Sequence, residues 1–218
     1  MIDIVNEIEA MHREVGTGRV AAGEGRALRM RRTYDAPIDD VWDAITSPSR
    51  LTRWFLPVSG DLRPGGRYQL EGNAGGEILA CDRPSRFKVT WAYGEPADPA
   101  DVSELEIRLS PAGEEATTLE LEHVAIVPDD RWEAYGPGAV GVGWDQGLLG
   151  LAAHLRGESL GNPETFALSE EARSFFAASS DAWAAANVAA GADPQVAATA
   201  AANTTGFYAP DPDANVPG

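Results

Sequence analysis

The sequence predicts an α+β fold, in which an antiparallel sheet of about six or seven strands is combined with one long helix. Apolar and charged residues alternate strictly in residues 104–109, the pattern of a strand that buries one face and exposes the other to water. Between residues 144 and 155, a tryptophan and three leucines repeat at intervals of four, three and four. That spacing predicts an amphipathic helix that ends near residue 156.

An amphipathic helix and a linker are expected at the N-terminus. Ile4, Ile8, Met11 and Val15 are spaced to line one face of a helix. Residues 16–25 contain four glycines, which indicates a linker.

The first strand is expected from Ala27, and two short helices follow it. Pro37 fits the first position of a helix, where its missing N–H has no intrahelical partner to lose. Ser47 and Pro48 repeat this start signal, and Pro57 ends the second helix.

Five further strands are expected between turn signals. They cover residues 67–71, 77–81, 86–92, 104–109 and 117–125, with a short additional strand near residues 59–62. Residues 135–143 contain four glycines and Pro137. They are expected to form a flexible loop and to act as a mobile lid, because glycine permits large backbone changes.

The C-terminal part is rich in alanine, with 16 alanines in residues 167–202. One helix is expected to begin near Ser169 and to stop at Gly191, and Asp193 with Pro194 should start another. The N-terminal helix and the Ser169 helix each have an apolar stripe without a partner in its own segment. We expect them to pack on each other, on the outer surface of the central domain, or across a homodimer.

The chain is therefore divided into four predicted segments. They are an N-terminal helix with a linker at residues 1–25, a folded domain at 26–157, a helical extension at 158–208, and a disordered tail at 209–218.

Composition excludes several classes of partner. The 34 acidic and 17 basic residues give a net charge of −17, which argues against nucleic-acid binding because that depends on clustered Lys and Arg. No apolar run approaches the roughly 20 residues that span a bilayer, and no basic run would bind an anionic membrane. Since the first residues do not resemble a secretory signal, a cytoplasmic location is expected.

The reactive residue types form no known catalytic or metal-binding pattern. Cys81 is the single cysteine, and the histidines at 12, 123 and 154 lack metal-ligand spacing. We therefore expect no metal, no cofactor and no catalytic residue.

Five phrases of the sequence occur in an order that points to a family. They are APIDDVWDAIT at 36–46, LTRWF at 51–55, PGG at 64–66, VTW at 89–91, and GWD at 143–145 leading into LLGL at 148–151. Together they resemble the heat shock protein 90 ATPase activator homologue family, within the START-like, birch-pollen-allergen-like superfamily (SRPBCC). The resemblance covers about residues 26–156.

The resemblance implies a helix-grip fold, in which a curved sheet wraps around the long helix and an apolar cavity between them receives a hydrophobic small molecule. The chaperone activators of the family carry a separate N-terminal domain. This sequence has only the short helix and linker in that place, so ATPase activation is not expected.

Eight residues are expected to face the cavity. They are Trp54, Phe55, Tyr68, Trp91, His123, Trp144, Leu148 and Leu151. The alternative for each is ordinary core packing, and for His123 it is a buried ring satisfied by one hydrogen bond. Gly147 and Gly150 lie with His154 on one flank of the long helix, where we expect another backbone or a ligand to approach closely.

Three functions follow in order of preference. The first is a module that binds a hydrophobic small molecule. The second is an aromatase- or cyclase-type enzyme that uses the same cavity, and the third is a protein-interaction or chaperone-cofactor domain.

Overall fold

The computed structural model describes residues 3–61, 63–96, 98–158 and 169–210. The chain divides into two compact units. We call Val15–Val127 with Gly147–Ser159 the sheet unit, and Met1–Glu14 with Pro128–Gln146 and Leu160–Gly218 the helical unit. Most of the predicted tail lies outside the described residues. None of the helices in the described part of the chain has the length and apolar character needed to cross a bilayer.

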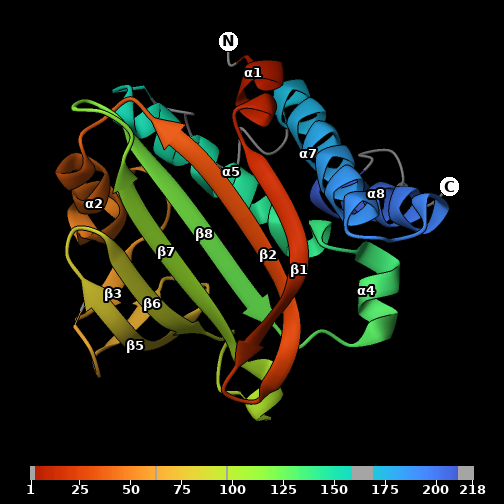
Figure 1. Ribbon diagram of the computed structural model, residues 1–218, viewed down its shortest axis with the longest axis horizontal. Helices are drawn as coiled ribbons and strands as arrows, with labels where there is room; N and C mark the ends of the chain where they lie inside the picture. The colour runs from red at the N-terminus through yellow and green to blue at the C-terminus, as the bar shows by residue number, and fades with distance from the viewer. Residues whose placement is uncertain (1–2, 62, 97, 159–168, 211–218) are drawn as a thin grey trace, which may run out of the picture. The chain divides into compact units, whose positions relative to one another are not determined.

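Within the described residues, eight strands form one sheet, rather than the six or seven expected. They are β1 (His12–Val20), β2 (Gly23–Tyr34), β3 (Val58–Gly60), β4 (Arg67–Leu70), β5 (Gly75–Asp82), β6 (Arg86–Trp91), β7 (Ser103–Pro111) and β8 (Thr117–Ala125). Their order is β1-β2-β8-β7-β6-β5-β4-β3 (Figure 1). The pairs β2–β8, β8–β7, β7–β6, β6–β5, β5–β4 and β4–β3 are antiparallel. The predicted α+β class with an antiparallel sheet is confirmed.

The glycine-rich residues 16–25 are strands and a tight turn, so the predicted linker is wrong. A β-carbon at Gly18 would lie 2.7 Å from a methyl group of Val124, and one at Gly25 would lie 2.5 Å from the carbonyl oxygen of Ala125. These glycines permit close packing against β8 instead of supplying flexibility.

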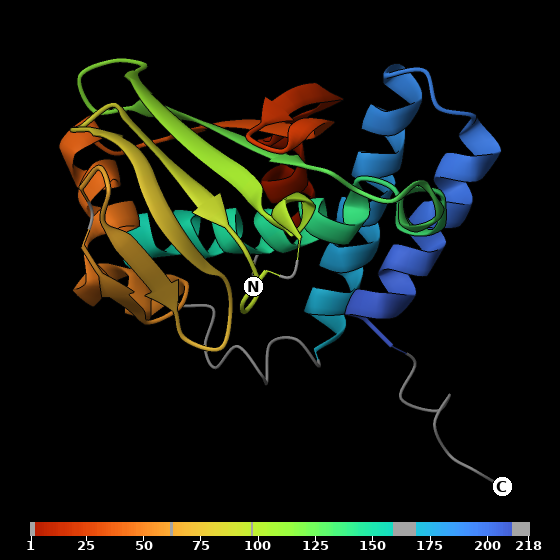
Figure 2. The same ribbon diagram turned by 90° about the horizontal axis from the view of Figure 1, so that it is seen from below.

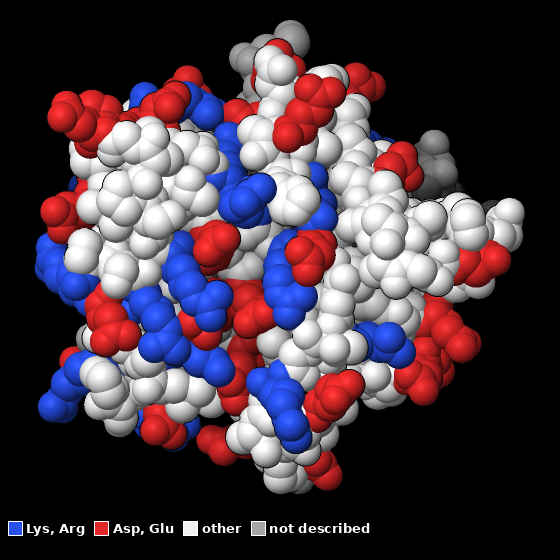
Figure 3. Space-filling model, viewed as in Figure 1, with Lys and Arg blue, Asp and Glu red and all other residues white. Residues whose placement is uncertain are grey.

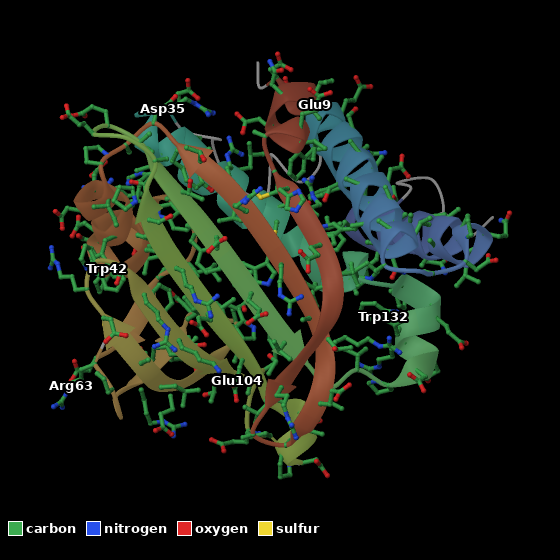
Figure 4. All side chains as sticks on the ribbon, in the orientation of Figure 1. Glu9, Asp35, Trp42, Arg63, Glu104 and Trp132 are labelled. Carbon is green, nitrogen blue, oxygen red and sulfur yellow. The ribbon has the colours of Figure 1, made fainter. Side chains whose placement is uncertain are left out.

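Charged side chains cover the outer face of the sheet (Figures 3 and 4). Glu104 and Glu106 were expected to be wet but are only 8% and 6% exposed. Lys88 lies 2.6 Å from Glu104, and Arg86 and Arg108 lie 2.7 and 2.8 Å from Glu106. The long basic side chains lie over the acidic ones, so this face is covered by its own ion pairs.

Two short helices follow β2, as the sequence predicted. They are α2 (Ile38–Thr46) and α3 (Pro48–Trp54). The second half of α5 (Gly138–Leu155) lies on the inner face of the sheet (Figure 2). The Tyr34 hydroxyl donates to the Leu148 carbonyl at 3.3 Å. Pro37 is the N-cap of α2, so the helix begins at Ile38, one residue later than predicted.

The helical unit contains α1 (Ile4–Glu9), α4 (Asp129–Tyr135), the first half of α5, α7 (Glu170–Ala189) and α8 (Pro194–Tyr208). Helix α7 packs against both α1 and α8, which confirms that the two terminal helices pack on each other. The predicted caps are also confirmed, because Ser169 accepts a hydrogen bond from Ala172 and Asp193 caps α8. Helix α1 is shorter than expected, since the chain enters β1 at His12. A homodimer through these helices stays a prediction.

Residues 135–143 do not form the predicted flexible loop. Only Gly136 and Pro137 separate α4 from α5, and Gly136 turns the chain with φ 57°. A β-carbon at Gly138 would lie 3.0 Å from a carbon of Thr204, and one at Gly141 would collide with the indole of Trp183, 2.2 Å from one of its carbons. These glycines let other helices approach α5 closely, so this segment is not a lid.

Candidate functional site

Three aromatic side chains form a row across the inner face of the sheet. They are Tyr68 on β4, Trp91 on β6 and His123 on β8. The ring centroids of Tyr68 and Trp91 are 6.3 Å apart, and those of Trp91 and His123 are 6.2 Å apart. Trp91 and His123 are each 6% exposed. Their strands alternate inward and outward residues, which is why His123 points inward as its parity with Leu119 and Leu121 predicted.

Tyr68 reaches over a glycine in the neighbouring strand. It pairs with Gly76 of β5, and its hydroxyl donates to the carbonyl oxygen of Thr90 at 2.8 Å. A β-carbon at Gly76 would collide with that same carbonyl oxygen. Burial raises the pKa of Tyr68 above its ordinary value, with a smaller contribution from Tyr93. Tyr68 is therefore a neutral phenol whose proton is held by the backbone.

His123 is held by a serine that the sequence analysis missed. The His123 Nε2 atom lies 2.8 Å from Ser103 Oγ, and Ser103 Oγ donates to the Trp91 carbonyl at 2.8 Å. Because that carbonyl can only accept, the hydroxyl proton points to it, and His123 Nε2 is the donor to Ser103. Burial lowers the pKa of His123 to about 4. At neutral pH the ring is uncharged, with its proton on Nε2.

Ser103 escaped prediction because the expected strand began one residue too late. β7 begins at Ser103, which shares its parity with Leu105 and Ile107. Extending the alternation back by one position would have placed the hydroxyl on the inner face.

Helices α3 and α5 approach each other closely at the end of the LTRWF phrase, residues 51–55. Trp54 and Phe55 stack with centroids 5.4 Å apart. A β-carbon at Gly150 of α5 would lie 2.7 Å from the Trp54 carbonyl oxygen, and one at Gly147 would lie 3.6 Å from the Phe55 ring. The expected close approach of a backbone is confirmed at Gly150, whereas Gly147 meets only a side chain at an ordinary contact distance.

The remaining predicted site residues are on α5. Leu148 and Leu151 are buried in the sheet unit at 4% and 0% exposure. Trp144 is half-buried and belongs to the helical unit. The aromatic row, the α3 pair and the two leucines are thus parts of one unit, and Trp144 is described with the other. Among the described residues, no three His, Cys, Asp or Glu side chains gather as a set of metal ligands.

A second buried polar cluster lies in the helical unit. Arg13 Nε and Nη2 each donate to one oxygen of Asp145 at 3.0 Å. Ser179 Oγ and Trp183 Nε1 donate to the same carboxylate at 2.5 and 3.0 Å. Burial raises the pKa of Asp145, and the Arg13 guanidinium opposes that change. Among the described residues, four donors contact this carboxylate, so the geometry suits its charged form.

The sequence carried one sign of this cluster. Ser179 interrupts the apolar face of α7 between Phe176 and Trp183, and it is fully buried. A buried hydroxyl on an apolar face needs a partner. The identity of that partner, Asp145, could not be read from the local sequence.

Solved structures similar to this chain include a bacterial protein of nearly the same extent. The crystal structure of CalU16 from Micromonospora echinospora is 38% identical, covers 81% of this chain and 98% of CalU16, and has a TM-score of 0.63. The solution NMR structure of CalU16 covers 84% and 97%, also at 38% identity, with a TM-score of 0.68. Protein MLL2253 from Mesorhizobium loti shares the fold, at 24% identity and a TM-score of 0.52, over 61% of this chain and 97% of its own.

Among proteins of curated function, none matches this chain. The family described as "Activator of Hsp90 ATPase homolog 1-like protein" matches residues 35–156. That range holds more than half of the sequence and includes the helices α2 to α5 and the strands β3 to β8. The resemblance inferred from the five phrases is confirmed, and the chain belongs to the activator of Hsp90 ATPase homolog 1-like family.

Proposed function

We propose that the sheet unit binds a hydrophobic small molecule on its inner face, between the aromatic row and the second half of α5. The observation that carries this proposal is the row formed by Tyr68, Trp91 and His123. The Tyr68 hydroxyl and the His123 Nε2 proton are both held within the protein. The row therefore offers uncharged ring surface, which suits an apolar or aromatic ligand.

An enzyme that uses the same face is the second candidate, and the geometry favours it less. The proton of Ser103 is directed to a backbone carbonyl, so this hydroxyl is not poised to lose it to His123. The low pKa of His123 keeps the ring neutral well below pH 7. Both features support a fixed binding surface over proton transfer.

Titration of the full chain with Nile red, an uncharged apolar dye, tests the proposal. We expect about one dye per chain and quenching of tryptophan emission, with binding weakened about tenfold by Trp91→Leu. Trp132→Phe is the matched control, because Trp132 is a half-buried tryptophan of α4 in the helical unit. Equal binding by both variants would place the dye elsewhere and overturn the proposal.

The same preparations separate the alternatives. Cyclisation or aromatisation of a bound substrate at a rate that His123→Phe abolishes would establish the enzyme. Acceleration of heat shock protein 90 ATPase without any dye binding would establish the chaperone-cofactor domain.

A further inference from the structure

Among the described residues of the sheet unit, α3 is the least buried α-helix. None of its residues is buried, whereas α2 buries Val41, Trp42, Ala44 and Ile45. Segments that bury little apolar surface open at low free energy, and the moving parts of binding sites are drawn from them. Residues 135–143 belong to α4, α5 and the short turn between them, so they do not supply a movable loop. In the sheet unit, α3 is the segment that buries little apolar surface and also carries predicted site residues.

The C-terminal end of α3 packs against two glycines of α5, Gly147 and Gly150. The Trp54 carbonyl oxygen approaches Gly150 so closely that a β-carbon there would lie 2.7 Å away. At Gly147 the nearest approach is the Phe55 ring, at an ordinary 3.6 Å. Glycine inside a helix costs about 1 kcal/mol relative to alanine. At position 150, the close backbone approach accounts for that cost.

A polar contact joins the other end of α3 to α5. Arg50 Nε donates to His154 Nε2 at 3.1 Å, so this nitrogen carries the lone pair and the ring is neutral. Arg50 Nη1 also donates to the Asp40 carboxylate at 2.5 Å and to Asp43 at 3.3 Å, both on α2. Arg50 thus connects α3 to α2 and α5 together.

The charges around His154 make this contact sensitive to protons. Burial, Arg50 and Arg53 lower the pKa of His154, and Asp40 opposes them. Asp43 faces Arg50 from α2. A proton on His154 Nε2 would point at the Arg50 Nε–H and would place an imidazolium cation beside the guanidinium. Protonation of His154 therefore breaks the hydrogen bond.

We propose that α3 is the movable wall of the ligand site, positioned on α5 by Gly150 and fastened by the Arg50–His154 hydrogen bond, which protonation of His154 releases. The statement that the wall belongs to a ligand site rests on the proposed function. The movement of α3 itself does not, and it can be measured without a ligand.

Amide hydrogen exchange of the full chain tests the movement. In wild type we expect α3 to exchange faster than α2 after correction for intrinsic rates. Gly150→Ala should speed exchange in α3 about tenfold, because its methyl group displaces the Trp54 backbone. Gly147→Ala, the matched control on the same helix, should leave α3 within about twofold of wild type. Equal exchange in the two variants, or wild-type α3 as protected as α2, would overturn the proposal.

A second variant tests the hydrogen bond between Arg50 and His154 without altering the packing against Gly150. His154→Gln offers an oxygen to Arg50 Nε and cannot be protonated. Lowering the pH to about 5 should speed corrected exchange of α3 in wild type but not in this variant. An acceleration of equal size in both would exclude His154 as the release.

Dye kinetics distinguish a failure of this inference from a failure of the proposed function. Faster Nile red association in Gly150→Ala than in Gly147→Ala supports the movable wall. Dye binding with equal rates in both variants rejects the wall and keeps the binding function. Exchange as expected without any dye binding keeps the movement and rejects the ligand site.

Discussion

The indole of Trp183 fills the space that a side chain at Gly141 would need, and its Nε1 donates to Asp145 one turn further along α5. A single tryptophan of α7 therefore requires both a glycine and an acid, spaced by one turn of the helix. This pair of requirements fixes where α7 docks on the first half of α5.

Replacing Gly141 with alanine tests the first requirement. Alanine favours a helix by about 1 kcal/mol, but its methyl group would push Trp183 away, at a cost of about 1 to 3 kcal/mol or more. We expect a net loss in the free energy of unfolding, measured by urea denaturation. Gly147→Ala is the control and should be neutral or stabilising. Equal stabilisation by both changes would show that Trp183 does not occupy this space.

The buried ion pair of Arg13 and Asp145 gives a second prediction. Asp145→Asn leaves the Arg13 charge buried without its partner, and should lower the free energy of unfolding by about 3 to 5 kcal/mol. The double variant Arg13→Met with Asp145→Leu removes both charges and should lose less than Asp145→Asn alone. A double variant that is less stable than Asp145→Asn would contradict this account.

Acid should destabilise the sheet unit through His123. Its folded pKa of about 4 lies below the ordinary 6.5, so the unfolded chain binds a proton at a pH where the folded chain does not. Stability is therefore fully present above about pH 6.5 and is lost as the pH falls toward 4, by about 3 kcal/mol in total. The measurement is the free energy of unfolding from pH 7 to pH 4, compared between wild type and His123→Phe.

In that comparison the variant should lose about 1 to 3 kcal/mol at neutral pH, because Ser103 is left without its donor. It should also show a flatter decline with acid. A decline as steep as that of wild type would assign the acid sensitivity to other groups.

Removing the chain after Gly157 should lower both the melting temperature and the solubility. The truncation takes away Ser179 and Trp183, two donors to the buried Asp145 carboxylate, and uncovers the apolar surface on which Phe175 packs. Light scattering and a thermal melt of the truncated chain measure both effects. A monodisperse product with an unchanged melting temperature would make the extension an independent tail.

Local signals predicted the elements well. Ser169, Asp193 and Pro48 start helices where expected, because a cap or a helix-starting proline acts within one turn of its own position. Strand alternation likewise placed His123 on the inner face. These features depend on neighbours in the sequence, so the sequence alone was enough.

The wrong predictions of flexible segments rested on their glycine content. Residues 16–25 and 135–143 were expected to be flexible, yet Gly18 and Gly141 are glycines because Val124 and Trp183 approach them. Those partners lie far along the chain, and composition cannot distinguish a glycine needed for close packing from one needed for freedom. Of the candidate site, the aromatic residues were identified, whereas Ser103 required an exact strand boundary and Asp145 required knowledge of contacts over long separations.

The separation of the Asp145 partners bears on how the protein is made. Arg13 lies 132 residues before Asp145, and Trp183 lies 38 residues after it. When the first half of α5 leaves the ribosome, one donor residue, Arg13, has already been made, and the other two, Ser179 and Trp183, have not yet been translated. The carboxylate can be fully enclosed only when residue 183 has emerged, so the helical unit is completed last, after every strand of the sheet has been available to pair.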